Sequence, residues 1–262
     1  MPSVFQVVSF LKFILKARTE HSIHSPFIFA FVTQVLRRKE KRNDILKKLE
    51  VFTNRLKIDK RIIEIHDLGA GSLINKKKKR SIADLAKNSS KPKFLLEILY
   101  KTSSFYQPKS ILELGTSIGL SGIYLKKGQA SGQILSIEGC TNTSKIAIEN
   151  FSKNQLENFE IINQNFDDFL KHLNPNQFFD LIFIDGNHQK NATIKYFNQL
   201  KNHINNDSVL IFDDIHWSTE MLEAWNEIKN DPLVKVSVDI YWMGFVFFKK
   251  ELTNQHFVVR PL

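Results

Sequence analysis

The stretch SILELGTSIGLS (residues 110–121) joins a short apolar run to a turn that contains two glycines. The run SILEL is typical of a buried strand. Gly115 and Gly119 bracket a tight strand-to-helix turn, where a nucleotide-like ligand can approach the backbone closely. Residues LSGIYLKK (120–127) continue with a helical pattern. The stretch therefore predicts a strand, a ligand-binding turn and a helix in succession.

The same alternation of strand and helix repeats along the chain after Pro108. Strand-like apolar runs lie at 110–114, 133–138, 159–163, 179–185, 208–214, 234–240 and 244–250. Helical patterns lie between them at 120–127, 142–153, 166–173, 188–203 and 218–229. Near-continuous apolar strands that alternate with helices indicate a parallel sheet covered on both faces. We therefore predict an α/β fold with a doubly wound, mostly parallel seven-stranded sheet whose last strand is antiparallel.

Residues 1–107 carry a mainly helical pattern instead. Helices are expected at about 4–17, 26–38, 43–56, 81–88 and 92–104. A short apolar stretch at 62–72 and a basic loop interrupt them. The sequence thus predicts an N-terminal helical extension or cover over 1–107, and a ligand-binding α/β domain over 108–262.

Composition narrows the class of protein. The chain has 262 residues, of which 42% are hydrophobic, and this is enough for a substantial core. A single cysteine, Cys140, excludes an internal disulfide framework and a zinc site with several cysteines. The net charge of +10 reflects a lysine-rich bias along the whole chain. The one dense cluster, KKKKR (76–80), has no aromatic residues interleaved, so we expect a solvated loop and no nucleic-acid partner.

The N-terminal segment MPSVFQVVSFLKFILKARTEHS is the only candidate targeting segment. Lys12 interrupts its apolar stretch and no small-residue cleavage site follows, so it is interpreted as an amphipathic helix. No stretch approaches the roughly 20 apolar residues that span a bilayer. We expect a cytoplasmic protein whose N-terminal helix packs on its own core. Contact with a membrane surface and packing in a homodimer remain the alternatives.

The strand ends are the next candidates for function, because ligands bind beyond the carboxyl ends of parallel strands. Glu138 ends the run at 133–138, and a carboxylate there can accept hydrogen bonds from two ribose hydroxyls. Ser117 stands where a dinucleotide-binding turn needs its second glycine, which disfavours a nicotinamide or flavin cofactor.

The pattern E-x-G-x-x-x-G at Glu113–Gly119, followed by Glu138, resembles the class I S-adenosylmethionine-dependent methyltransferases. The strand FDLIFIDG and the closing hairpin are also similar to that family, and the resemblance covers about 105–250. It implies a Rossmann-like fold in which 108–262 bind S-adenosylmethionine and catalyse methyl transfer. It further implies that Glu138 holds the ribose. The other cofactor-binding residues that it implies are Glu113, Gly115, Thr116, Ser117, Gly119, Asn165, Phe166 and Asp185.

A narrower resemblance is to the metal-dependent O-methyltransferases of the catechol and macrolide-sugar type. FIDGNH (183–188) and FDDIHW (212–217) match the strand ends that hold Mg²⁺ in that group. The resemblance implies that Asp185, Asp213 and Asp214 bind Mg²⁺ and that His188 acts as the catalytic base. Converging carboxylates would repel one another unless a cation lay between them, and Mg²⁺ prefers hard oxygen ligands.

Each of these residues also has a structural interpretation. Asp185 would then serve only the cofactor or cap a helix, the pair Asp213–Asp214 would cap helix 218–229, and His188 would be a surface residue. Two further residues, His216 and Trp217, are expected to line the substrate pocket.

The segment HSIHSPFIF (21–29) raises a separate question. Pro26 suits the first turn of a helix, so the segment predicts a capped helix start. The alternative is a loop that covers the active site, in which His24 contacts the substrate. The wording HSPF resembles the N-terminal extension of bacterial methyltransferases, and that resemblance implies no substrate. DLGAGS (67–72) mimics a cofactor turn but is followed by a basic loop, so we discount it.

Together these observations predict an S-adenosylmethionine-dependent methyltransferase that acts on a hydroxyl of a small molecule with help from Mg²⁺. One alternative is a methyltransferase that acts on nucleic acid or protein. The motif for methylation of base amino groups is absent, because the sequence at its expected position, the end of the run at 179–185, is DGNH (185–188). Another alternative is a cofactor-binding module without catalytic activity. The acceptor and the oligomeric state cannot be derived from the sequence.

Overall fold

A computed structural model describes residues 3–19, 23–39, 43–65, 78–88 and 91–261 of the chain. Contacts between residues divide the chain into two units. Unit 1 comprises Met1–Arg37 and Leu170–Leu262, and unit 2 comprises Arg38–Phe169. The two units are not divided at residues 107/108, where the sequence suggests a domain boundary. That domain boundary stays a prediction. The segment 67–72, which mimics a cofactor turn, lies outside the described residues.

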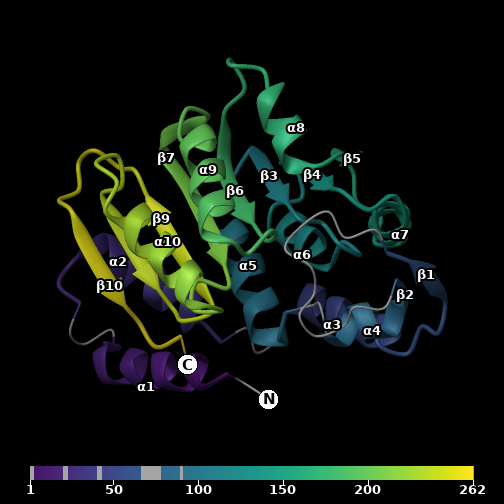
Figure 1. The fold of residues 1–262 in the computed structure, drawn as a ribbon, viewed down its shortest axis with the longest axis horizontal. Helices are drawn as coiled ribbons and strands as arrows, with labels where there is room; N and C mark the ends of the chain where they lie inside the picture. Colours follow the sequence, from purple (N-terminus) through teal and green to yellow (C-terminus); the bar gives the residue numbers. More distant parts are fainter. Residues whose placement is uncertain (1–2, 20–22, 40–42, 66–77, 89–90, 262) are drawn as a thin grey trace. The chain divides into compact units, whose positions relative to one another are not determined.

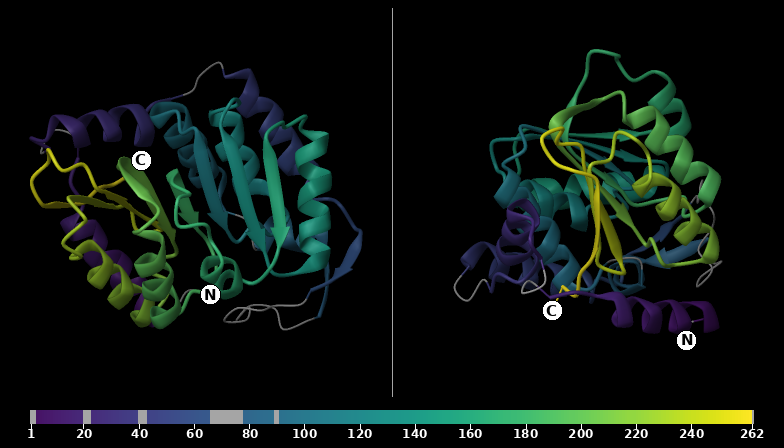
Figure 2. Two further views of the ribbon diagram at one scale, coloured as in Figure 1. Left: turned by 90° about the horizontal axis from the view of Figure 1, so that it is seen from above. Right: turned by 90° about the vertical axis from the view of Figure 1, so that its left-hand side faces the viewer.

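Three parallel strands form the sheet of unit 2 (Figures 1 and 2). They are β3 (Ser110–Leu114), β4 (Gln133–Glu138) and β5 (Phe159–Asn163), in the order β3-β4-β5. Helix α6 (Leu120–Gly128) joins β3 to β4, and α7 (Thr141–Lys153) joins β4 to β5. All five predicted elements are thus confirmed. The parallel direction brings the carboxyl ends of β3 and β4 to the same side of the sheet.

The rest of unit 2 is mainly helical, as predicted. It contains α3 (Asp44–Leu56), α4 (Ile82–Asn88) and α5 (Lys93–Tyr106). A hairpin of β1 (Ile62–Glu64) and β2 (Lys79–Ser81) lies between α3 and α4 along the chain. The last two residues of KKKKR therefore belong to a strand, where a solvated loop was expected. Helix α8 (Phe166–Lys171) follows β5 and ends just beyond the boundary of the unit.

Unit 1 carries the second group of strands. They are β6 (Phe179–Ile184), β7 (Ile204–Asp213), β8 (Val236–Asp239), β9 (Met243–Phe247) and β10 (Gln255–Val258). Their order is β10-β8-β9-β7-β6, and β6 and β7 are parallel. Strand β9 is antiparallel to both β7 and β8. Helices α9 (Lys190–Leu200) and α10 (Thr219–Lys229) connect β6 to β7 and β7 to β8.

Among the strands that follow Pro108, β10 was not predicted. The sequence predicts seven strands that end at 244–250, but β10 is an eighth strand and pairs parallel with β8. Two of its four residues are polar, and Phe257 alone is buried, so the apolar run that marks the other strands is missing. The antiparallel strand of the predicted hairpin is β9, and it lies between β8 and β7.

The N-terminal segment of unit 1 folds as α1 (Val4–Lys16), α2 (Pro26–Phe31) and a π-helical turn, η2 (Val32–Leu36). Ser25 caps α2 by accepting a hydrogen bond from the amide of Ile28 (3.5 Å), and Pro26 occupies the first turn. The predicted capped helix start is therefore confirmed. Helix α1 packs on unit 1, because Ser9 and Phe13 are buried. No helix in the described part of the chain is long and apolar enough to cross a membrane.

Candidate functional site

The turn between β3 and α6 is the first candidate site. Gly115, Ser117 and Gly119 all have positive φ angles, of 102°, 49° and 87°. The amides of Gly115 and Thr116 both donate to the carbonyl of Ile137 on β4, at 3.0 and 3.3 Å. The turn is therefore fixed against the neighbouring strand. The Thr116 hydroxyl is buried, and the described residues offer it no hydrogen-bond partner. A buried hydroxyl of this kind is suited to a polar ligand.

Glu138 lies beside this turn at the end of β4. One of its carboxylate oxygens accepts a hydrogen bond from the Ser117 amide (2.7 Å), and the other accepts one from the Cys140 amide (2.8 Å). A carboxylate oxygen can accept more than one hydrogen bond, so this group is also suited to ligand hydroxyls. The structure thus brings Glu138 to the glycine turn. The two amides also fix the direction in which its carboxylate points.

Glu113 has a different environment from the one expected of a cofactor ligand. Its side chain is fully buried, and it accepts hydrogen bonds from the hydroxyls of Ser121 (2.6 Å) and Ser136 (2.8 Å). A Cβ atom on Gly122 would lie 2.6 Å from the Glu113 carboxylate. Glu113 therefore ties the start of α6 to β3 and β4. Its predicted contact with the cofactor stays a prediction.

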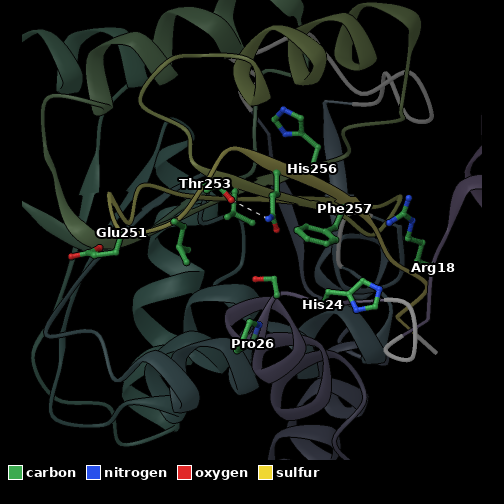
Figure 3. Close-up of a pocket in the computed structure, with 11 residues that line it drawn as sticks. Arg18, His24, Pro26, Glu251, Thr253, His256 and Phe257 are labelled. Carbon is green, nitrogen blue, oxygen red and sulfur yellow. Dashed lines mark hydrogen bonds between the residues drawn. The ribbon is translucent and has the colours of Figure 1, made fainter.

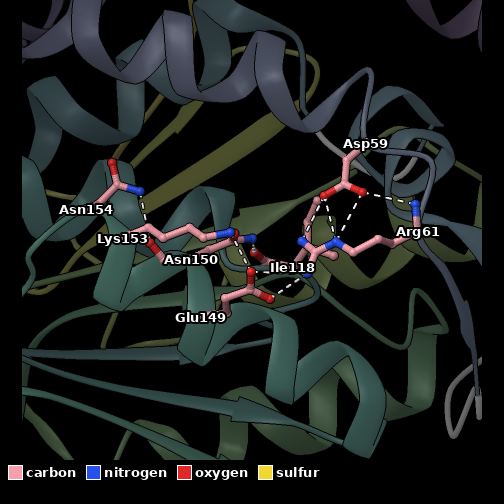
Figure 4. A network of polar contacts seen from close by, with 7 residues as sticks. All are labelled: Asp59, Arg61, Ile118, Glu149, Asn150, Lys153 and Asn154. Atoms are coloured by element: carbon pink, nitrogen blue, oxygen red, sulfur yellow. Dashed lines mark hydrogen bonds and ion pairs between the residues drawn. The ribbon is translucent and has the colours of Figure 1, made fainter.

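A polar network on α7 supports the same turn (Figure 4). The buried Asn150 side chain donates to the carbonyl of Ile118 at 2.8 Å. On the outer side of α7, Arg61 donates to both Asp59 and Glu149, which lowers the pKa of each carboxyl. These contacts connect the segment before β1 to the helix that holds the turn. The sequence analysis missed Asn150, whose position inside a helical pattern gives no sign of this contact.

Replacing Gly119 by alanine is expected to destabilise unit 2. The added Cβ would lie 2.9 Å from the Phe151 ring, and a φ of 87° is strained for any residue with a side chain. The expected loss is about 1–3 kcal/mol in the free energy of unfolding, measured by urea denaturation. Alanine in place of Gly139, whose φ angle is not positive, is the matched control. Equal stability of the Gly119→Ala protein and the wild type would contradict the assigned turn geometry.

The predicted adenine-binding residues lie at the start of α8. Asn165 caps this helix, since its side-chain oxygen accepts from the Asp168 amide at 2.8 Å and its amide group donates to the Asp168 carboxylate. Phe166 is half-buried. Both residues follow β5, as the sequence indicated. Their contact with adenine stays a prediction.

The second candidate site lies in unit 1, where β6 and β7 end. Asp185 directly follows β6, and Asp213 is the last residue of β7. Since Ile184 pairs with Phe212 in parallel register, the two strand ends meet. Asp185, His188 and Asp213 each offer one ligand atom, and these atoms all lie within 4.8 Å of one another. We refer to these three residues as the acidic cluster. Asp213 is buried, and the other two are half-buried.

Asp214 is not a member of the acidic cluster, although the sequence predicts it as a metal ligand. Its φ angle is 54°, and its amide donates to the carbonyl of Trp242 at 2.7 Å. His188 Nε2 lies 3.9 Å from both the Asp214 Oδ2 and the Asp185 Oδ1 atoms. His188 thus lies near two carboxylates.

His216 connects two elements of unit 1, and its predicted place in the substrate pocket stays a prediction. It is 8% exposed, and both ring nitrogens are engaged: Nδ1 with the Ser9 hydroxyl (2.6 Å) and Nε2 with the Asp239 carboxylate (2.8 Å). The imidazole therefore connects α1 to the end of β8. Trp217 is half-buried, and its carbonyl accepts from the Gln6 side chain at 3.1 Å. Its place in a substrate pocket stays a prediction.

Two aromatic residues near the acidic cluster were not among the predicted site residues. Tyr241 and Trp242 form the turn between β8 and β9, and the carbonyl of Trp242 accepts from Asp214. Burial raises the pKa of the Tyr241 hydroxyl, and the charges of Asp214 and Asp239 raise it further. The predicted hairpin contained the necessary signal, because its turn must lie at the same end of the sheet as the carboxyl end of β7.

His24 lies elsewhere in unit 1, in a pocket of about 530 Å³ (Figure 3). Other lining residues are Arg18, Pro26, Glu251, His256 and Phe257. No residue of the acidic cluster lines this pocket. The structure therefore separates His24 from the residues predicted to bind metal, and its contact with a substrate stays a prediction.

Part of the chain matches a known family, and the fold matches several solved structures. A sequence family described as a methyltransferase domain matches residues 112–215, which run from β3 to just beyond β7. The SAH-bound methyltransferase PaMTH1 from Podospora anserina has a TM-score of 0.60 at 15% identity, with 87% of this chain and 97% of that chain covered. An O-methyltransferase from Bacillus cereus in complex with SAH has a TM-score of 0.56 at 18% identity, with 84% and 97% covered.

The O-methyltransferase TomG from Streptomyces achromogenes, solved with SAM, is similar at a TM-score of 0.56 and 14% identity, with 79% and 91% covered. At these identities the structural matches establish the fold. The predicted Rossmann-like fold is therefore confirmed. Residues 112–215 match a methyltransferase domain.

Proposed function

We propose that the protein is an S-adenosylmethionine-dependent O-methyltransferase that acts on a small-molecule hydroxyl with help from a divalent cation. The observation that carries the proposal is the acidic cluster in a chain with a methyltransferase domain. Two neighbouring strand ends present Asp185 and Asp213 together, and a cation would offset their mutual repulsion.

The residues of unit 2 fit the cofactor. The positive φ angles of Gly115 and Gly119 allow the sharp turn after β3, and the buried Thr116 hydroxyl has no hydrogen-bond partner among the described residues. The Glu138 carboxylate would accept hydrogen bonds from the two ribose hydroxyls. S-adenosylmethionine supplies the methyl group on a sulfonium. The protein contributes by holding this group in a fixed direction, since positioning provides much of the catalysis of a direct displacement.

The residues of unit 1 fit a cation. Asp185 and Asp213 offer the hard oxygen ligands that Mg²⁺ prefers. A bound divalent cation would make the proton of an acceptor hydroxyl easier to remove. His188 would accept this proton at Nε2, which lies 3.9 Å from a carboxylate oxygen of Asp185 and 3.9 Å from one of Asp214.

A direct test is the release of S-adenosylhomocysteine from S-adenosylmethionine in the presence of acceptors. The panel would contain catechols, other hydroxylated aromatic compounds and sugar hydroxyls, each with Mg²⁺, Mn²⁺ or Zn²⁺ and with EDTA. We expect release that depends on an acceptor and drops at least about tenfold with EDTA.

Two outcomes would contradict the proposal. Methylation of RNA or of a protein substrate, with none of the small molecules active, would favour the alternative acceptors that the net charge of +10 allows. Binding of S-adenosylmethionine without turnover on any acceptor would indicate a catalytically silent module.

A further inference from the structure

Helix α1 presents an apolar face to solvent along its whole length. Val4, Val8, Leu11 and Leu15 are 82%, 44%, 58% and 86% exposed. Their spacing of four, three and four residues keeps them on one side of an α-helix. We call these four residues the apolar stripe. Isolated exposed apolar side chains are ordinary, but a continuous row on one helix marks an interaction surface.

The orientation of α1 is fixed by contacts on its opposite side. Ser9 bonds to the buried His216, and the carbonyl of Gln6 accepts a hydrogen bond from the Tyr241 hydroxyl at 2.8 Å. Phe13 is 3% exposed and packs against Tyr241 with ring centroids 5.5 Å apart. A capping box between Ser3 and Gln6 fixes the start of the helix. The apolar stripe therefore faces outward because polar and aromatic contacts hold the helix in that orientation.

Positive charge borders the apolar stripe. Lys12 and Lys16 are exposed and lie one turn apart on the same flank of α1, and the helix contains no acidic residue. Lys229 on α10 is close enough for the charge of Lys16 to lower its pKa, in addition to the larger effect of burial. Arg18 follows the helix and is exposed. An apolar face with lysines at its border is the pattern of helices that lie in a lipid headgroup layer, where lysine side chains extend to the phosphates.

Such a helix face could bind either a second copy of the chain or a lipid bilayer, and the charge of the protein distinguishes between them. A second copy of the chain would bring another set of lysines against this flank and another net charge of +10 toward the first. An anionic bilayer would instead attract the same charges. We propose that α1 docks on the surface of an anionic lipid bilayer, with the apolar stripe in the headgroup layer and Lys12 and Lys16 on lipid phosphates. This surface is independent of the proposed methyl transfer.

Sedimentation with lipid vesicles tests the proposal. The full chain would be mixed with vesicles of phosphatidylcholine containing phosphatidylglycerol, and separately with phosphatidylcholine alone, over a series of NaCl concentrations. We expect binding to the anionic vesicles that weakens as salt rises. The variant Leu11→Ser/Leu15→Ser should bind at least about tenfold more weakly, and Lys12→Glu/Lys16→Glu should also lose about tenfold. The matched control, Ile58→Ser/Ile62→Ser, alters two residues that are 74% and 70% exposed in unit 2 and should bind like the wild type.

Three results would overturn the proposal. The first is a wild-type protein that stays in the supernatant with anionic vesicles at low salt. The second is sedimentation that neither double variant reduces. The third is a light-scattering mass of two copies that falls to one copy in Leu11→Ser/Leu15→Ser, because a second chain would then cover the apolar stripe. The lysine variant keeps the test valid if the serine variant alters folding, which circular dichroism would reveal.

Discussion

Replacing Asp213 by alanine is expected to lower the rate of methyl transfer by at least about a thousandfold, because it removes the buried ligand of the acidic cluster. Loss of one of two carboxylates would also abolish the stabilisation that a divalent cation gives to the folded protein. The thermal midpoint of the wild type should rise with Mg²⁺ or Mn²⁺, and that of the Asp213→Ala protein should not. In the absence of metal, the variant should be as stable as the wild type or more stable, since one source of repulsion is gone.

Asp214→Ala is the matched control for this prediction. Asp214 is the neighbour of Asp213 but lies outside the acidic cluster, so its loss should lower the rate by less than about tenfold. The double change of Asp213 and Asp214 to alanine should match the single change at Asp213. Methyl transfer that survives both EDTA and the double change would exclude a role for metal. A loss at Asp214 as large as at Asp213 would restore the three-aspartate site that the sequence predicts.

The second large effect is expected at Glu138. Its replacement by alanine should weaken the binding of S-adenosylmethionine by about 30- to 150-fold in calorimetry, which corresponds to about 2–3 kcal/mol. The change removes the acceptor proposed for two ribose hydroxyls. It also leaves the amides of Ser117 and Cys140 without their carboxylate partner, so the turn loses part of its support.

Two variants separate these contributions. Glu138→Gln keeps one oxygen for a hydroxyl or an amide and should fall between the wild type and alanine. Glu160→Ala removes an exposed carboxylate on β5 of the same unit and should leave affinity unchanged. An affinity of Glu138→Ala within about twofold of the wild type would mean that the cofactor binds elsewhere.

The sequence predicted the elements that depend on local pattern. Apolar runs such as 179–185 and 208–214 correspond to β6 and β7, because a buried strand needs little more than a row of apolar side chains. Predicted site residues lie at or just after the ends of these strands, and parallel neighbours bring their carboxyl ends together. Strand β10 was missed, since its pairing with β8 determines its conformation more than its own sequence does.

The features that depend on distant contacts could not be derived in this way. The position of His216 beside two aspartates predicts a substrate-pocket residue. Its hydrogen-bond partners, Ser9 and Asp239, lie far away along the chain. Glu113 matches a family motif, and only the fold reveals that two serine hydroxyls enclose it. Asp214 follows Asp213 directly, but it has a left-handed backbone and is not part of the set that Asp213 forms with Asp185 and His188. Spacing along the chain does not determine these orientations.

We propose that one chain holds S-adenosylmethionine at the glycine turn and a divalent cation at the acidic cluster. A crystal structure of the protein with S-adenosylhomocysteine and Mg²⁺ would test both sites at once. We expect the ribose hydroxyls to lie within hydrogen-bonding distance of the Glu138 carboxylate and a cation to lie between Asp185 and Asp213. A nucleoside bound away from Glu138, or the absence of a cation between the two aspartates at saturating Mg²⁺, would contradict the proposal.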